Sequence, residues 1–204
     1  MNLYKSFKPF LTLVMSTACM LSAHAAQATT ITMDELDEQS VNGLSLKGAH
    51  FSFAIDGSAS LDARINASGV GALTYVQDPS LEGSTAGVLS IDFAQAVNTI
   101  SFGVALSSEF ELQDAALIRL VAADATPIAD QWVSTLPLIL FSEARYEYTG
   151  QAVSRIEVSF ADHSNRFVID NLSFATSSVP EPSTALILLV GLAALAAIRP
   201  QSTR

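Results

Sequence analysis

Cysteine is nearly absent from this sequence, since Cys19 is the only one in 204 residues. It lies close to the N-terminus, so the remainder of the chain has no disulfide framework, no thiolate metal site and no cysteine nucleophile. Any folded region must therefore be stabilised by an ordinary hydrophobic core, which about 145 residues can supply.

Basic residues are also scarce, with 10 Lys and Arg against 20 Asp and Glu and a net charge of −10. Between Thr29 and Ser178 the sequence has 6 basic and 19 acidic residues. Binding to nucleic acid depends on neutralising phosphates with Lys and Arg, so we predict no nucleic-acid partner. An acidic surface suits solubility, a calcium-rich exterior or repulsion of anionic polymers.

Motifs of catalysis are missing as well. The sequence has no G-x-S-x-G, no H-E-x-x-H and no Gly-rich phosphate loop. After the leader the histidines are His50, in an alternating stretch, and His163, which follows Asp162 in a loop-like stretch. Adjacency in sequence does not bring side chains together, so we predict a protein that is not an enzyme, with a hydrolase as the remote alternative.

The N-terminus has the three parts of a secretory signal peptide. Lys5 and Lys8 precede an apolar run over 10–21, and small residues follow around Ala25 and Ala28. This pattern predicts a signal peptide over 1–28, cleaved after either alanine. A lipoprotein signal at Cys19 is the alternative, although Ser16 stands where that signal normally has leucine.

The middle region, 29–175, consists of short alternating stretches separated by turn residues. Alternation of apolar and polar residues indicates strands with one buried and one wet face. We predict an all-β fold, an antiparallel two-sheet sandwich that is jelly-roll-like, with a short helical turn possible over 110–116. The expected strands are 49–55, 72–77, 88–93, 100–106, 115–123, 132–141, 145–149, 155–160 and 166–174.

The last expected strand breaks the alternation. Phe167 and Ile169 occupy odd positions, whereas Leu172 and Phe174 occupy even ones. A regular strand has a side-chain period of two. Either a bulge at Asp170 and the following Asn restores the pattern, or both faces are buried and Asp170 needs a partner.

The C-terminal part reads as a linker over 176–184 followed by an apolar helix and basic end over 185–204. The prolines of the linker favour an extended backbone that a protease can reach. As a helix, the uninterrupted apolar run over 185–198 rises roughly 21 Å. A bilayer core is about 30 Å thick, so the run is a marginal span. A helix buried in the core is the alternative.

This tail resembles that of the PEP-CTERM proteins of Gram-negative bacteria. The matching core motif is Val179, Pro180, Glu181, Pro182, followed by Ser and Thr. The resemblance implies export through the inner membrane, a transient hold there by the C-terminal helix, and cleavage by exosortase. The product would be a surface or biofilm-matrix component. The family usually ends in clustered arginines. Here only two arginines, Arg199 and Arg204, follow the apolar run, which weakens membrane retention.

A weaker resemblance covers the middle region. Residues 31–36 with 47–53, and then 167–174, look like the opening and closing strands of extracellular jelly-roll domains and of several carbohydrate-binding modules. In such modules an aspartate of the last strand often holds a structural calcium with acidic residues near the first strand. The resemblance thus implies that Asp170 with Asp34 or Glu35 ligates calcium. The alternative is that Asp170 caps a bulge through backbone amides.

Few aromatic residues are placed to contact a glycan. Trp132 is the only tryptophan, and its companions are Tyr75, Tyr146 and Tyr148. Tyr146 and Tyr148 share a strand face by parity. We predict a non-enzymatic secreted component, with a carbohydrate-binding module for exopolysaccharide as the alternative function. In that case Trp132, Tyr146 and Tyr148 are the candidate glycan contacts, whereas ordinary core packing is the simpler interpretation of the same residues.

Overall fold

The computed structural model describes residues 28–176, except 67–69, 72 and 162–164. These residues belong to one compact unit, Gln27–Ser177. Apart from the boundary residues Ala28 and Thr176, the predicted signal peptide, sorting motif and C-terminal helix lie outside the described residues. Within the described part there is no helix, and so none that is long and apolar enough to cross a membrane.

All pairings between the strands are antiparallel in this part of the chain. The prediction of an all-β, antiparallel, jelly-roll-like fold is confirmed. The strands are β1 (Ala28–Ile31), β2 (Ser45–Leu46), β3 (Ala49–Ile55), β4 (Ser58–Ala59), β5 (Arg64–Asn66), β6 (Ser80–Ser84), β7 (Gly87–Leu106), β8 (Leu112–Val121), β9 (Pro127–Leu138), β10 (Phe141–Phe160) and β11 (Arg166–Thr176).

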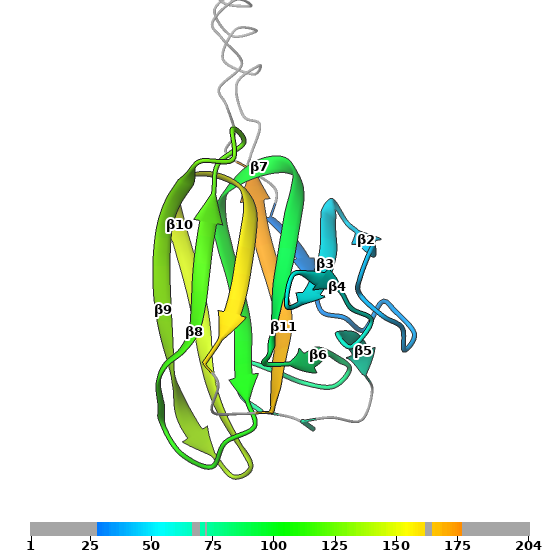
Figure 1. Cartoon of the computed structure of the whole chain (residues 1–204), viewed down its shortest axis with the longest axis vertical. Coiled ribbons are helices and arrows are strands. Elements are labelled where there is room, and N and C mark those ends of the chain that lie inside the picture. The colour runs from blue at the N-terminus through cyan, green and yellow to red at the C-terminus, as the bar shows by residue number, and fades with distance from the viewer. Residues whose placement is uncertain (1–27, 67–69, 72, 162–164, 177–204) are drawn as a thin grey trace, which may run out of the picture. The chain divides into compact units, whose positions relative to one another are not determined.

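Two long strands, β7 and β10, run through both layers of the unit (Figure 1). In the first sheet, the first half of β7 lies between β3 and the second half of β10, which is followed by β8 and β9. In the second sheet, the other half of β7 lies between β11 and the first half of β10, and β6 and β1 line the outer edge of β11. Register shifts between Thr149 and Arg155 mark where the shared strands bend from one sheet to the other.

Aromatic side chains join the two layers at the core. Phe167 of β11 lies 5.9 Å from Phe53 of β3 and stacks on Phe160 of β10 with ring centroids 4.1 Å apart. Phe93 of β7 and Phe174 of β11 form a similar pair at 4.9 Å. Offset and tilted aromatic pairs add stabilisation beyond their buried area, so these contacts fix how the sheets face one another.

The structure corrects four local expectations. The predicted strand 132–141 is interrupted by a turn, because β9 ends at Leu138 and β10 begins at Phe141. Of residues 72–77, those that the structure describes form a loop over the second sheet rather than a strand. Residues 110–116 contain no helical turn, because β8 already begins at Leu112. The short strands β1, β2, β4, β5 and β6 were not predicted. Most of them are too short to show an alternation, and in β6 four of the five residues are buried.

The predicted irregularity of the last strand is confirmed, and both alternatives contribute to it. Asp170 pairs with Gly103 and Ser173 pairs with Ser101, so β11 contains one extra residue at this point. Asn171 supplies it with a φ of 56°, as in bulges whose first residue is left-handed. Asp170 and Val168 are nevertheless buried, because a loop covers the other face of β11.

Candidate functional site

The loop over the second sheet, which we call the strap, comprises Val70–Asp78, with residue 72 not described. Carboxylates of the sheet hold it through its backbone amides. Glu143 of β10 accepts hydrogen bonds from Thr74 N at 3.0 Å and Tyr75 N at 2.9 Å. Asp170 accepts one from Gln77 N at 3.0 Å. Hydrogen bonds to an ionised acceptor are stronger than neutral ones, so the strap has a defined position.

Gly103 of β7 allows the strap to lie directly on the sheet. A Cβ atom at this position would be 2.1 Å from the carbonyl oxygen of Tyr75. Contacts of that length do not occur between non-bonded atoms, so only glycine permits this approach. The strap thereby presents the side chain of Tyr75, 40% exposed, beside the first half of β10.

Asp170 caps the bulge of β11. Besides Gln77 N, it accepts hydrogen bonds from Asn171 N at 2.6 Å and from Asn171 Nδ2 at 3.0 Å. Burial raises the pKa of the Asp170 carboxyl to about 6, against the opposing effect of these amides, and the nearby carboxylates of Asp34 and Glu35 raise it further. Asp34 and Glu35 thus lie near enough to Asp170 to influence its pKa, but Glu35 forms its ion pair with Lys47.

The calcium hypothesis for Asp34 and Asp170 stays a prediction. Among the described residues no three His, Cys, Asp or Glu side chains are grouped so that they could hold a metal ion. The carboxylate oxygens of Asp170 already accept the amides of the bulge and strap, which is the alternative role that we considered for this residue.

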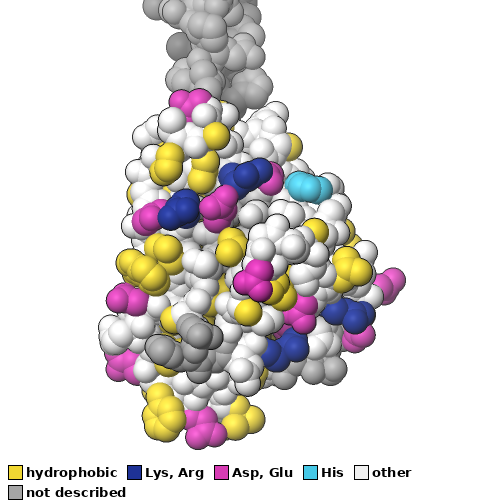
Figure 2. Space-filling view, viewed as in Figure 1, with side chains coloured by type: hydrophobic (Ala, Val, Ile, Leu, Met, Phe, Trp, Pro, Cys, Tyr) yellow, Lys and Arg dark blue, Asp and Glu magenta, His cyan; other side chains and the backbone are white. Residues whose placement is uncertain are grey.

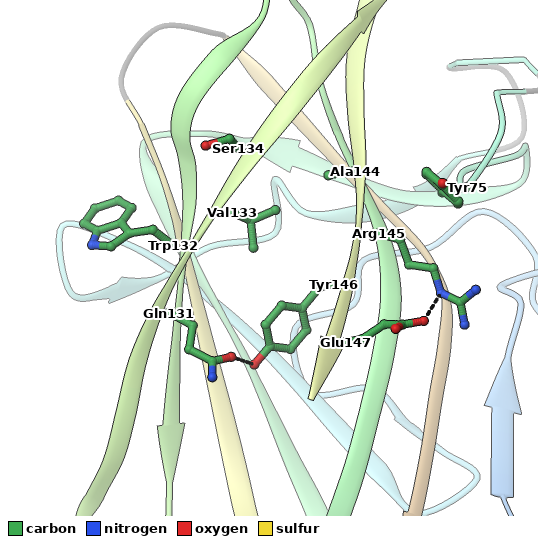
Figure 3. Close-up of a pocket in the computed structure, with 9 residues that line it drawn as sticks. All are labelled: Tyr75, Gln131, Trp132, Val133, Ser134, Ala144, Arg145, Tyr146 and Glu147. Carbon is green, nitrogen blue, oxygen red and sulfur yellow. Dashed lines mark hydrogen bonds and ion pairs between the residues drawn. The ribbon is translucent and has the colours of Figure 1, made fainter. Parts of the chain in front are cut away.

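A groove of about 870 Å³ opens where β9 and β10 separate (Figure 3). The two strands form a hairpin that pairs from Leu138 and Phe141 as far as Leu136 and Glu143. Beyond it β9 follows the first sheet and β10 the second, so a gap remains between them. The groove is lined by Tyr75, Gln131, Trp132, Val133, Ser134, Ala144, Arg145, Tyr146 and Glu147.

Tyr146 closes the floor of the groove. Its ring packs on Phe102 at 5.0 Å, and its hydroxyl donates a hydrogen bond of 2.6 Å to Gln131 Oε1 across the gap. Burial raises the pKa of Tyr146 above its usual value, so the phenol remains protonated and acts as a donor. Of the predicted glycan contacts, Tyr146 is thus a core residue with only its polar end near the groove.

Trp132 and Tyr148 take different positions. Trp132 is 57% exposed on the rim formed by β9 and points away from Tyr146. Tyr148 does not line the groove, and its hydroxyl donates to the carbonyl oxygen of Gln151 at 2.9 Å. The structure therefore brings Trp132 and Tyr146 to one groove but does not form a shared aromatic platform from the three residues.

The opposite rim was not predicted as such, although its Tyr75 was named among the aromatic residues. It consists of Tyr75 on the strap and the ion pair Arg145–Glu147 on β10, in which Arg145 Nε lies 2.9 Å from Glu147 Oε1. A second hollow of about 380 Å³ continues from this rim and contains the hydroxyl-bearing residues Thr30, Ser101 and Ser173. This rim forms only because segments that are distant in sequence lie side by side. No local sequence pattern therefore predicts it.

His50, the histidine that the structure describes, is not arranged for catalysis. Its Nδ1 lies 2.8 Å from Ser45 Oγ on an exposed surface. Asp92 faces His50 across the strands but pairs with Arg155 at 2.7 Å. A nucleophilic triad needs a carboxylate that orients the imidazole, and the described residues provide none for His50. His163 lies outside them.

The fold class comes from the structure, and a sorting motif comes from comparison with known protein families. The fold and groove define an antiparallel β-sandwich with an open polar cleft. Residues 178–199 match the PEP-CTERM protein-sorting motif, so the chain carries this motif and the sequence resemblance of its tail is confirmed. The motif indicates export and sorting to the cell surface or the extracellular space. No curated protein sequence matches the chain.

Several solved structures are similar to the described unit. The family 29 carbohydrate-binding module CBM29_1 from Piromyces equi is 13% identical, with 76% of this chain and 95% of that one covered and a TM-score of 0.43. The K2 adhesin domain of Lys-gingipain is 10% identical, with coverages of 72% and 99% and a TM-score of 0.44. Both TM-scores are below 0.5.

Proposed function

We propose that this protein is a non-enzymatic component of the cell surface or extracellular matrix, delivered there by exosortase. The sorting motif at 178–199 carries the proposal. Exosortase cleaves near the Pro-Glu-Pro sequence after the chain has crossed the inner membrane, and the apolar C-terminal segment holds the chain only until then. The acidic sandwich remains as the final product.

The mass of the mature protein tests this proposal. We expect intact mass spectrometry of material from the medium or surface to show a C-terminus close to Glu181, and the variant Glu181→Ala to retain its tail in the membrane fraction. Glu147→Ala, which changes the same net charge far from the motif in sequence, is the control. An uncleaved C-terminus in every fraction would refute the proposal.

A second function, glycan binding, is favoured by the groove between β9 and β10. Saccharides are bound through aromatic faces together with a few placed polar groups, and the groove has an aromatic side chain on each rim. Trp132 and Tyr75 are both substantially exposed. Gln131, Ser134 and the Arg145–Glu147 pair supply donors and acceptors between them. An extended polysaccharide chain fits this open shape better than a small enclosed ligand.

Affinity electrophoresis through gels that contain the producer's exopolysaccharide tests the second function. We expect Trp132→Ala and Tyr75→Ala each to reduce retardation several-fold, because each removes the aromatic face of one rim. Phe110→Ala, which removes an exposed aromatic residue outside the groove, is the matched control. If neither rim variant changes the retardation, the groove is not the glycan-binding site. That result would leave the sorting proposal intact.

A further inference from the structure

The end of the unit that carries the β9–β10 hairpin exposes large apolar side chains, which we call the apolar tip. They are Phe110 in the loop between β7 and β8, and Leu136, Ile139 and Leu140 of the hairpin. Their exposed fractions are 75%, 64%, 89% and 62%. Figure 2 shows hydrophobic side chains with an acidic one between them at this end, where Figure 1 places the hairpin.

The turn itself does not require these residues. Ile139 and Leu140 connect Leu138 of β9 directly to Phe141 of β10. Tight turns favour Gly, Asn, Asp and Ser, which tolerate a positive φ or bond to the nearby backbone. Neither Ile139 nor Leu140 has a positive φ, so polar residues would adopt the same conformation. Exposed apolar residues at a position that accepts polar ones indicate a contact surface.

Strand register brings the two parts of the apolar tip together. Leu106, the last residue of β7, pairs with Ser142, and Leu112, the first of β8, pairs with Thr135. The loop that contains Phe110 therefore crosses beside the base of the hairpin. The chain enters and leaves the unit at the other end of the second sheet, where Ala28 pairs with Ala175. The apolar tip thus points away from the attachment of the sorting tail.

The charges around the apolar tip are negative. Glu109 and Glu111 flank Phe110, and Arg119 is the only basic residue between 107 and 143. Arg119 is paired with Asp130 on the outer face of the first sheet. Arg166 also lies at this end, where its carbonyl oxygen accepts Ser107 N, and its side chain pairs with Glu82. Both of these described cations are therefore already paired with a carboxylate, whereas Glu109 and Glu111 can match the ammonium group of phosphatidylethanolamine.

We propose that the apolar tip inserts into a bilayer surface rich in phosphatidylethanolamine. A stable protein–protein contact needs about 800 Å² on each partner, and four projecting side chains on a narrow end do not form such a face. A bilayer needs no complementary shape, because its apolar interior accepts single side chains that reach below the headgroups. The carboxylates of Glu109 and Glu111 then lie at headgroup level.

The test uses the full chain with Cys19→Ser and an environment-sensitive fluorophore on a single introduced cysteine. One protein carries it at Ile139→Cys in the apolar tip. The control carries it at Ala152→Cys, an exposed position in the bend of β10 at the opposite end. The apolar segment 185–198 can attach either protein to vesicles, so the readout is the environment of each label rather than the amount of protein bound.

With phosphatidylethanolamine–phosphatidylcholine vesicles, we expect a blue shift and quenching by brominated acyl chains at position 139 and neither effect at 152. Phe110→Ser with Leu136→Ser should reduce the shift several-fold at an unchanged melting temperature, and phosphatidylglycerol should reduce it in the parent chain. An unshifted label at 139, equal shifts at both positions, or a shift without vesicles that grows with protein concentration would overturn the proposal. The last result would assign the apolar tip to a second copy of the chain.

Discussion

Glu143 determines where Tyr75 lies. The side chain of Glu143 is on β10, and its Oε2 accepts the backbone N–H of Tyr75 at 2.9 Å while its Oε1 accepts that of Thr74. The two residues are 68 positions apart in sequence. One buried carboxylate therefore positions the aromatic rim of the groove through the backbone of the strap.

We first predict that Glu143→Gln destabilises the strap. An amide side chain keeps one acceptor but turns a donor toward the second N–H, so one buried hydrogen bond to a charged group is lost. The expected cost is about 1–3 kcal/mol of unfolding free energy, measured by urea denaturation. Limited proteolysis should cut the strap faster. Glu109→Gln, an exposed change of equal charge, should alter neither, and equal behaviour of both variants would contradict the prediction.

The second prediction concerns Gly103→Ala. The added methyl group would meet the backbone oxygen and carbon of Tyr75 at 2.1 and 2.7 Å, so the strap must move away. Overpacking of this kind costs about 1–3 kcal/mol. Gly150→Ala is the matched control, because its methyl group would meet the hydroxyl end of the Tyr148 side chain, which can rotate away. Equal denaturation midpoints for the two variants would show that the strap does not rest on Gly103.

The sequence predicted the sheet better than the site. Alternation identified β3, most of β7 and the second half of β10 because one face of each packs into the core. It also located the bulge at Asp170, because the apolar residues change there from odd to even positions. It did not detect that two predicted strands form one continuous β7, because the bend between the sheets lies within a paired segment.

The groove depends on relationships that single positions do not reveal. Trp132 and Tyr146 were named as aromatic residues, yet their orientations differ because they occupy strands of different sheets. Tyr75 lies on the rim because Glu143 and Gly103 position the strap. Both residues are distant from Tyr75 in sequence, and no motif marks either of them. Such non-local contacts are set by topology, and no periodicity in the chain encodes them.

The third prediction is a pH dependence of stability from Asp170. Burial raises the pKa of its carboxyl from 3.8 to about 6, so the folded state binds this proton more tightly than the unfolded state. The stabilisation is complete below pH 3.8 and is lost as the pH rises through about 6. We expect the melting temperature of the parent chain, relative to Asp170→Asn, to fall between pH 4 and 6.

The same melts test calcium at Asp170. Added calcium ions that raise the melting temperature at pH 7 in the parent chain but not in Asp170→Asn would support the calcium hypothesis for Asp34 and Asp170. Equal melts in calcium and in chelator would reject it and leave Asp170 as the cap of the bulge. If the difference in melting temperature between the parent chain and Asp170→Asn stays constant between pH 4 and 6, the raised pKa of Asp170 is contradicted.

The fourth prediction concerns the charge of the glycan. Arg145 is the basic residue of the groove, and Glu147 neutralises it over 2.9 Å. An acidic domain also repels polyanions, so we expect neutral polysaccharides to be retained better than those containing uronic acids. Glu147→Gln leaves Arg145 unneutralised and should increase retardation in acidic polysaccharide gels at low salt, where charge interactions are least screened. Glu109→Gln changes the net charge equally outside the groove. If both variants gain equally, total charge alone governs binding and Arg145 does not select the ligand.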